Sequence, residues 1–135
     1  MAYTDSLKRQ HDEILKSATE LSQLLFPERL NGSEAIKILS QLSGKLSAHL
    51  AMEDKVLYPK LYQHDNPAIR QTARSFFNEM GGLSEAFRDY CNKWQDNIDI
   101  DSKPIDFIED TKALFNILGQ RIHKEDNILY PMADH

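Results

Sequence analysis

A seven-residue phrase, Glu-Asp-x-x-Leu-Tyr-Pro, occurs twice in the chain, at residues 53–59 and again at residues 125–131. Each copy follows a long stretch in which apolar residues recur every three or four positions, the spacing of one face of an α-helix. Proline ends or kinks such a helix, because it lacks a backbone N–H and its ring clashes with the preceding turn. The repeat therefore predicts two helical hairpins, each of which closes with a long helix that ends near a proline.

Four long helical segments follow from this periodicity and from the breaker residues between them. We expect them at about residues 5–25, 34–62, 67–94 and 105–130. Ser33 is the expected N-cap of the second helix, and Gly81-Gly82 is a weak point in the third. No segment alternates with a period of two, and the polar residues 96–104 are expected to form a loop. The predicted fold is all-α, an antiparallel up-down-up-down four-helix bundle that forms a single domain over residues 1–135.

Charge and cysteine usage restrict the function classes. The net charge of −5 argues against nucleic acid as a partner and against a basic membrane-surface protein, since phosphate contacts need clustered lysine and arginine. No stretch is long and apolar enough to predict a membrane span or a signal core. The one cysteine, Cys91, has no internal partner, which favours a reducing, cytoplasmic location.

Ionisable residues interrupt the apolar faces of three of the four predicted helices. They are His11, His49, Glu53, Arg121 and Glu125. Burying a charge costs several kcal/mol unless the charge is paired or binds a metal, so these positions need an explanation. Counting from the helix ends places all five at one end of an antiparallel bundle, with Phe76 and Met80 of the third helix at the same level.

His49 and Glu53 are four residues apart, so an imidazole and a carboxylate lie on one helical face. Such a pair can bind a metal ion, or it can form a buried hydrogen bond in a helical core. A metal-free network in which all five ionisable residues satisfy one another is also coherent. The residues alone leave both interpretations open.

The pattern of His11, His49-x-x-x-Glu53 and Glu125 followed by Leu-Tyr-Pro resembles the hemerythrin-like, or HHE cation-binding, family. The resemblance implies a four-helix bundle with a non-haem di-iron centre, and a link to oxygen binding or sensing, nitric oxide responses or iron handling. In the fuller members, one iron takes a histidine from each of the first two helices. The other iron takes two histidines from the third helix and one from the fourth, and carboxylates of the second and fourth helices bridge the pair.

Transferred residue by residue, the resemblance assigns metal ligands to half of that centre. His11 and His49 match the ligands of the first iron. Glu53 matches one bridging carboxylate, and Glu125 (or Asp126, with a one-residue change of spacing) matches the other. The resemblance thus implies non-haem iron as the cofactor. The half-site that this sequence retains predicts one ion, with zinc or manganese as alternatives.

The ligands of the second iron are missing from this sequence. Arg121 stands where the fourth helix needs a histidine, and the third helix offers Phe76 and Met80. We expect the guanidinium of Arg121 to substitute for the charge of the second metal and to bridge Glu53 and Glu125. Phe76 and Met80 would then fill the remaining volume.

Three function classes follow. The first is a metal-binding module for sensing, storage or stress response toward oxygen, nitric oxide or iron, with a metal ion and a small diatomic ligand as its partners. The second is a metal-free helical bundle that acts through protein contacts, and the third is a non-haem iron enzyme that acts on nitric oxide or peroxide. We expect the chain not to be an enzyme, because no nucleophile–base pair, phosphate loop or cofactor motif is present in the sequence.

Three further residues are predicted to lie outside the site. His123 lies about 200° round the helix from Arg121, and Glu79 lies off the apolar stripe of the third helix, so both are expected at the surface. Cys91 is expected to be inert.

Overall fold

The computed structural model describes residues 4–134, and over this range it is all-helical, without strands. The all-α class predicted from the sequence is therefore confirmed. The elements are α1 (Asp5–Ser22), α2 (Gly32–Met52), η1 (Glu53–Leu57), α3 (Tyr58–Tyr62), α4 (Pro67–Met80), α5 (Leu83–Lys93), α6 (Asn97–Ser102), α7 (Pro104–Lys124), η2 (Glu125–Leu129) and α8 (Tyr130–Ala133). The two η elements are single π-helical turns, in which a residue bonds to the fifth residue before it.

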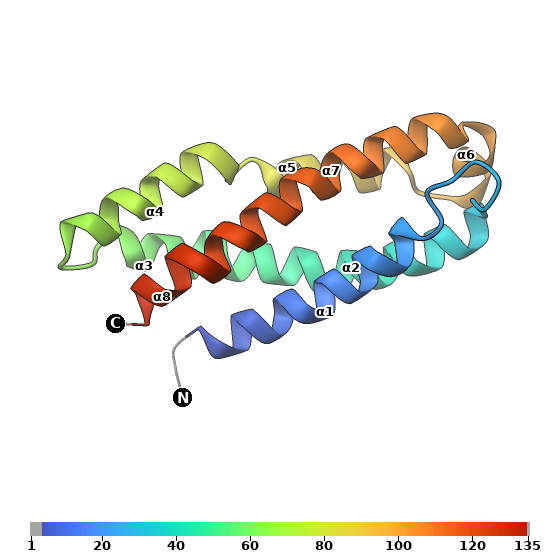
Figure 1. The fold of residues 1–135 in the computed structure, drawn as a ribbon. Helices are drawn as coiled ribbons and strands as arrows, with labels where there is room; N and C mark the ends of the chain where they lie inside the picture. Colours follow the sequence, from blue (N-terminus) through green and yellow to red (C-terminus); the bar gives the residue numbers. More distant parts are fainter. Residues whose placement is uncertain (1–3, 135) are drawn as a thin grey trace.

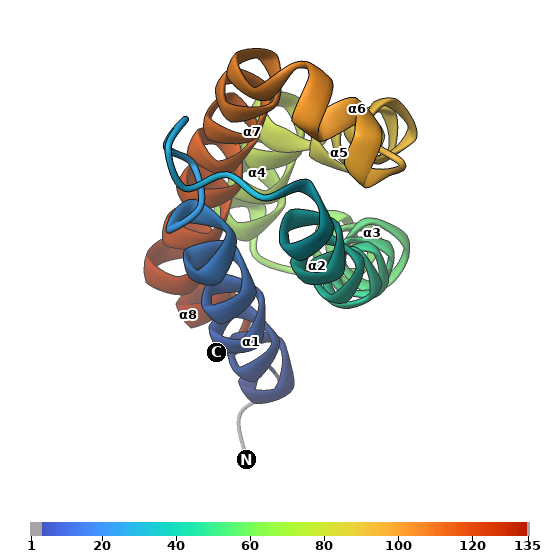
Figure 2. The ribbon, with the colours of Figure 1, turned by 90° about the vertical axis from the view of Figure 1, so that its right-hand side faces the viewer.

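The long helices lie side by side along the length of the molecule (Figure 1). Helix α1 packs against α2, and α5 packs against α7. Contacts of α2 with α5 and of α1 with α7 join the two pairs. Viewed from the end, α1, α2, α5 and α7 surround a common centre (Figure 2). Across the described residues, every helix is too short or too polar to cross a lipid bilayer.

The start of α2 differs from the prediction. The N-cap is Asn31, whose side chain accepts a hydrogen bond from the Glu34 backbone N–H at 3.1 Å, and not Ser33. Gly32 is the first residue of the helix. This position requires glycine, because a Cβ there would lie 2.4 Å from the carbonyl oxygen of Asn97. The close approach comes from α6, which packs against α2.

Helix α6 itself was predicted as a loop. Asp96 caps it by accepting a hydrogen bond from the Asp99 backbone N–H at 2.9 Å. Ile100 is its buried anchor in the core. One apolar side chain in a polar segment gives no periodic pattern, so packing against α2 decides this short helix.

The third predicted helix breaks at Gly81-Gly82, as its sequence indicated. Helix α4 ends at Met80 and α5 begins at Leu83. A Cβ at Gly81 would lie 2.4 Å from the carbonyl oxygen of Phe77, so this bend requires glycine. The break leaves the carbonyl of Met80 at a helix end, where it has no intrahelical partner.

The second predicted helix continues past Pro59 to Tyr62, as expected, and the fourth continues past its expected end at residue 130 to Ala133. Each passes through a π-helical turn that the sequence did not predict. In η1 the N–H of Tyr58 bonds to the carbonyl of Glu53, and in η2 the N–H of Tyr130 bonds to that of Glu125. Each wide turn lies just before a proline, whose ring would clash with the preceding turn of a regular α-helix.

The extra residue in each π turn shifts the buried face by one position. A regular helical period places Val56 and Ile128 on the apolar stripes, but they are 49% and 46% exposed. Their neighbours Leu57 and Leu129 are buried instead. The error arose because the periodicity of 3.6 residues was continued through a turn that contains one residue more.

The apolar core consists of two clusters. The larger one includes Ile14, Leu50 and Leu118, and the smaller one includes Leu7, Leu57 and Leu129. On α1, on α2 with η1, and on α7 with η2, the ionisable residues lie between members of the two clusters. A buried polar layer therefore separates the two apolar halves of the bundle.

Candidate metal centre

The polar layer gathers the ionisable side chains that were predicted from the sequence. His11 comes from α1, His49 from α2, and Arg121 from the last turn of α7. Glu53 and Glu125 are the first residues of the two π turns. All five are at most 3% exposed, so no water compensates for the burial of their charges.

Four of these side chains offer ligand atoms to one point. One donor atom from each of His11, His49, Glu53 and Glu125 lies within 4.8 Å of the others. Nε2 of His49 lies 3.0 Å from Oε1 of Glu53, and Nε2 of His11 lies 3.2 Å from Oε1 of Glu125. Adjacent ligands of one ion, each bound at roughly 2.1 Å and at right angles, are about 3.0 Å apart, so this spacing fits a metal ion.

Two of the ligand atoms lack a hydrogen bond. Nε2 of His49 and Oε1 of Glu125 are buried and have no hydrogen-bond partner among the described residues, although each is close to a charged or polar neighbour. Buried polar atoms in folded proteins are nearly always paired, and an unpaired one needs an explanation. A cation between these atoms satisfies both.

The outer nitrogens of the imidazoles fix their orientation. Nδ1 of His49 lies 2.6 Å from Oε1 of Gln10, and Nδ1 of His11 lies 2.8 Å from Oδ1 of Asp126. Both partners are acceptors, so each Nδ1 carries the proton and donates it. Each Nε2 then presents a lone pair toward the carboxylates, as in the histidine ligands of known metal sites.

Two tyrosines bind the carboxylates from the other side. Tyr58 donates a hydrogen bond to Oε2 of Glu125 at 2.8 Å, and Tyr130 donates one to Oε2 of Glu53. In a regular α-helix a residue five positions along is rotated by about 140°, and would point away. The π turn places each tyrosine on the same side of the helix as the glutamate five residues before it, and so on the face of the layer. From there each hydroxyl reaches the glutamate of the other repeated phrase.

Arg121 occupies the other half of the layer. Its Nε donates to Oε2 of Glu125 at 3.1 Å, and its Nη2 contacts Oε1 of Glu53 at 3.3 Å and Oδ1 of Asp54 at 2.7 Å. Its Nη1 reaches the free carbonyl of Met80 at 3.4 Å, at the break between α4 and α5. The guanidinium thus touches both glutamates, on the side away from the two imidazoles.

Comparison with models of known protein families shows which family the chain belongs to. The model of the hemerythrin HHE cation-binding domain matches residues 3–133, nearly the whole chain. The chain belongs to the hemerythrin family. Comparisons with curated proteins and with solved structures gave no match. Family membership, together with the His/Glu cluster, supports metal binding by this hemerythrin domain.

Burial and charge set the protonation of this hemerythrin site in the absence of a cation. Burial opposes the charge of His11, but contacts with neighbouring carboxylates, Glu125 first, outweigh it and raise its pKa. Burial and the charge of Glu53 raise the pKa of Glu125. Burial also disfavours ionised Glu53, yet His49 and Arg121 hold its pKa below the ordinary value. A cation at this site would favour the deprotonated forms of these groups.

Sequence reasoning named Asp126 only as an alternative to Glu125, and it assigned no contact to Asp54, Tyr58 or Tyr130. The two aspartates repeat with the glutamates and the two tyrosines repeat with the prolines, so the internal repeat was the signal for these contacts. Gln10, next to His11, gave no such signal.

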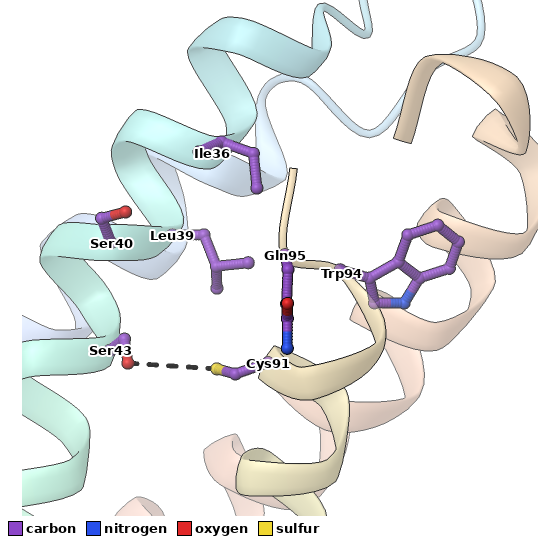
Figure 3. A pocket seen from close by; sticks show the side chains of 7 residues that line it. All are labelled: Ile36, Leu39, Ser40, Ser43, Cys91, Trp94 and Gln95. Carbon is purple, nitrogen blue, oxygen red and sulfur yellow. Dashed lines mark hydrogen bonds between the residues drawn. The ribbon is translucent and has the colours of Figure 1, made fainter. Parts of the chain in front are cut away.

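The residues predicted to lie outside the site do so. His123 is exposed, and exposed Glu79 forms an ion pair with Lys124 at 2.6 Å. Cys91 lies opposite Ser43, between α2 and α5 (Figure 3). The hollow there has a volume of about 310 Å³, and no residue of the polar layer lines it. Burial raises the pKa of the Cys91 thiol, which disfavours the reactive thiolate.

Proposed function

We propose that this hemerythrin domain binds a single metal ion through His11, His49, Glu53 and Glu125. The observation that carries the proposal is the pair of buried ligand atoms without hydrogen bonds, Nε2 of His49 and Oε1 of Glu125. Two imidazoles with carboxylates and open positions suit iron(II), and zinc and manganese are the alternatives. The bound ion would supply a Lewis-acidic, redox-active centre, while the chain excludes water and fixes both imidazoles.

Arg121 takes the place of a second ion in this proposal. Its permanent charge lies against Glu53 and Glu125. Burial opposes this charge, but the neighbouring carboxylates, Glu125 first, outweigh burial and keep the pKa of Arg121 above the ordinary value. Phe76 and Met80 are buried in the smaller apolar cluster, and their side chains carry no ligand atom that iron favours. A second iron would therefore meet a fixed cation and no imidazole.

The physiological role that we propose is sensing, storage or stress response toward oxygen, nitric oxide or iron. It is supported by membership of the cation-binding family and by the buried site. We further propose a single domain over residues 1–135 with antiparallel up-down-up-down topology. A cytoplasmic location stays a prediction from the lone cysteine.

Elemental analysis after anaerobic loading tests the proposal. Chains loaded separately with iron(II), zinc(II) and manganese(II) should bind about one ion each. The His49→Ala variant should bind none, whereas His123→Ala, which alters an exposed histidine, should bind as the wild type does. Two irons per chain with an oxo-to-iron absorption band would contradict the mononuclear site.

One observation favours a metal-free bundle as the second candidate. Arg121 contacts Glu53, Asp54 and Glu125, so the carboxylates are already partly neutralised without a metal ion. Thermal melts before and after chelation distinguish the two candidates, because a ligand that binds only the folded state raises its stability. An unchanged melting temperature supports the metal-free bundle. Turnover of nitric oxide or peroxide by the iron-loaded chain would instead support an enzyme.

A further inference from the structure

We propose that Tyr130 is a direct ligand of the bound metal ion, as a phenolate when that ion is ferric. The inference rests on the proposed function, because it needs an ion at the site. It adds to the two imidazoles and two carboxylates a fifth ligand of a different chemical class.

The position of the Tyr130 hydroxyl carries the argument. Its oxygen lies 3.1 Å from Nε2 of His11 and is hydrogen-bonded to Oε2 of Glu53, so it adjoins two ligand residues at once. The phenol ring stacks on the imidazole of His11, with ring centroids 5.2 Å apart and an interplanar angle of 17°. Since Nδ1 of His11 is bound to Asp126, Nε2 is the nitrogen left to bind the ion. A spacing of 3.1 Å is what two neighbouring ligands of one ion show, about 3.0 Å.

The internal repeat provides a natural comparison, because Tyr58 occupies the same place in its own phrase. The hydroxyl of Tyr58 bonds to Oε2 of Glu125, the same oxygen that accepts from Nε of Arg121. The guanidinium carbon of Arg121 lies 5.4 Å from the Tyr58 ring centroid. Tyr58 therefore faces the half of the layer that holds the guanidinium, and Tyr130 faces the half that holds the imidazoles.

Coordination exchanges one bond for another. The O–H bond of Tyr130 breaks, an O–metal bond forms, and the proton leaves to solvent. A metal cation drives this exchange, because its charge offsets the charge of the oxyanion, as with metal-bound water and thiols. A phenolate beside two carboxylates brings three negative charges to one ion, which matches ferric iron better than ferrous iron.

The experiment compares the wild type with Tyr130→Phe and Tyr58→Phe. Each protein is loaded anaerobically with iron(II) and then treated with one equivalent of ferricyanide, which accepts the one electron released. Iron per chain, visible absorption and resonance Raman spectra are recorded, with a wild-type sample grown on ring-deuterated tyrosine. We expect a visible phenolate-to-iron band in the wild type, with ring vibrations that shift on deuteration.

Tyr58→Phe should keep this band, and Tyr130→Phe should lose it while still binding about one iron. If Tyr130→Phe fails to fold, the assignment rests on the other four tyrosines. A deuterium-sensitive band that persists in each of Tyr3→Phe, Tyr58→Phe, Tyr62→Phe and Tyr90→Phe supports Tyr130, and a band lost in one of them overturns it. Iron bound by the wild type without phenolate vibrations overturns the role of Tyr130 alone. So does a band that survives in Tyr130→Phe. A wild type that binds no metal ion overturns both this proposal and the proposed function.

Discussion

Replacing Arg121 with methionine removes the one permanent positive charge from the buried layer and largely preserves side-chain length. The guanidinium is 1% exposed and contacts Glu53, Asp54 and Glu125, at distances between 2.7 and 3.3 Å. Removing one partner of a buried ion pair costs about 3–5 kcal/mol, because the remaining charges lose their compensation in a dry site. We expect a loss of this size in the free energy of unfolding of the metal-free protein. For a chain of this length, that corresponds to a fall of roughly 10–20 °C in melting temperature.

The assay is urea unfolding and thermal melting in the presence of a chelator, so that metal binding does not contribute. The loss in the free energy of unfolding should shrink as the pH falls. The pKa of Glu125 is already raised, and removing Arg121 raises it further, so protonation at low pH neutralises the uncompensated carboxylate. The difference between variant and wild type should therefore grow as the pH rises through the raised pKa values.

Two control variants separate charge from general damage. Arg121→Lys keeps the charge but loses the planar fork of donors, so an intermediate loss is expected. Arg88→Met removes a 67%-exposed side chain whose contact with Glu85 is 3.8 Å long, and should change stability by less than about 0.5 kcal/mol. The reasoning is refuted if metal-free Arg121→Met is as stable as the wild type or as Arg88→Met.

Three further predictions concern the site. His49→Ala should bind no metal in elemental analysis, because it removes an inward-facing ligand nitrogen; binding at wild-type stoichiometry would exclude His49 as a ligand. Arg121→His should not bind a second iron, because α4 and α5 contain no histidine; two irons per chain would refute this. Gln10→Leu should weaken metal affinity about 10–100-fold in chelator competition, because Nδ1 of His49 loses its acceptor at 2.6 Å. An unchanged affinity would show that this hydrogen bond does not orient the imidazole.

Much of the fold could be predicted because helical periodicity is local. The stripes on α1, α2 and α7 identified the long helices and placed His11, His49 and Glu53 on their buried faces. A helix holds its own backbone hydrogen bonds, so composition and spacing along the chain suffice to recognise it. The break at Gly81-Gly82 was predictable for the same reason.

The π turns could not be predicted in this way. A regular α-helical period continued past Glu53 and Glu125 places Val56 and Ile128 on the buried face, whereas the structure exposes both side chains. The wider turn is stabilised by the tyrosine hydroxyls that it brings to the carboxylates, an effect that propensity does not record. The proline of each repeated phrase is the local sign of this irregularity.

By itself, the sequence determined the long helices, the buried face of each helix up to its π turn, and a set of buried ionisable residues that contains two imidazoles and one guanidinium. Only the tertiary structure decided how these groups are paired. The bond from Tyr130 to Glu53 and the contact of His11 with Asp126 join residues 77 and 115 positions apart in the chain. Spacing along a helix carries no information on such contacts, because they depend on how separate helices meet across the core.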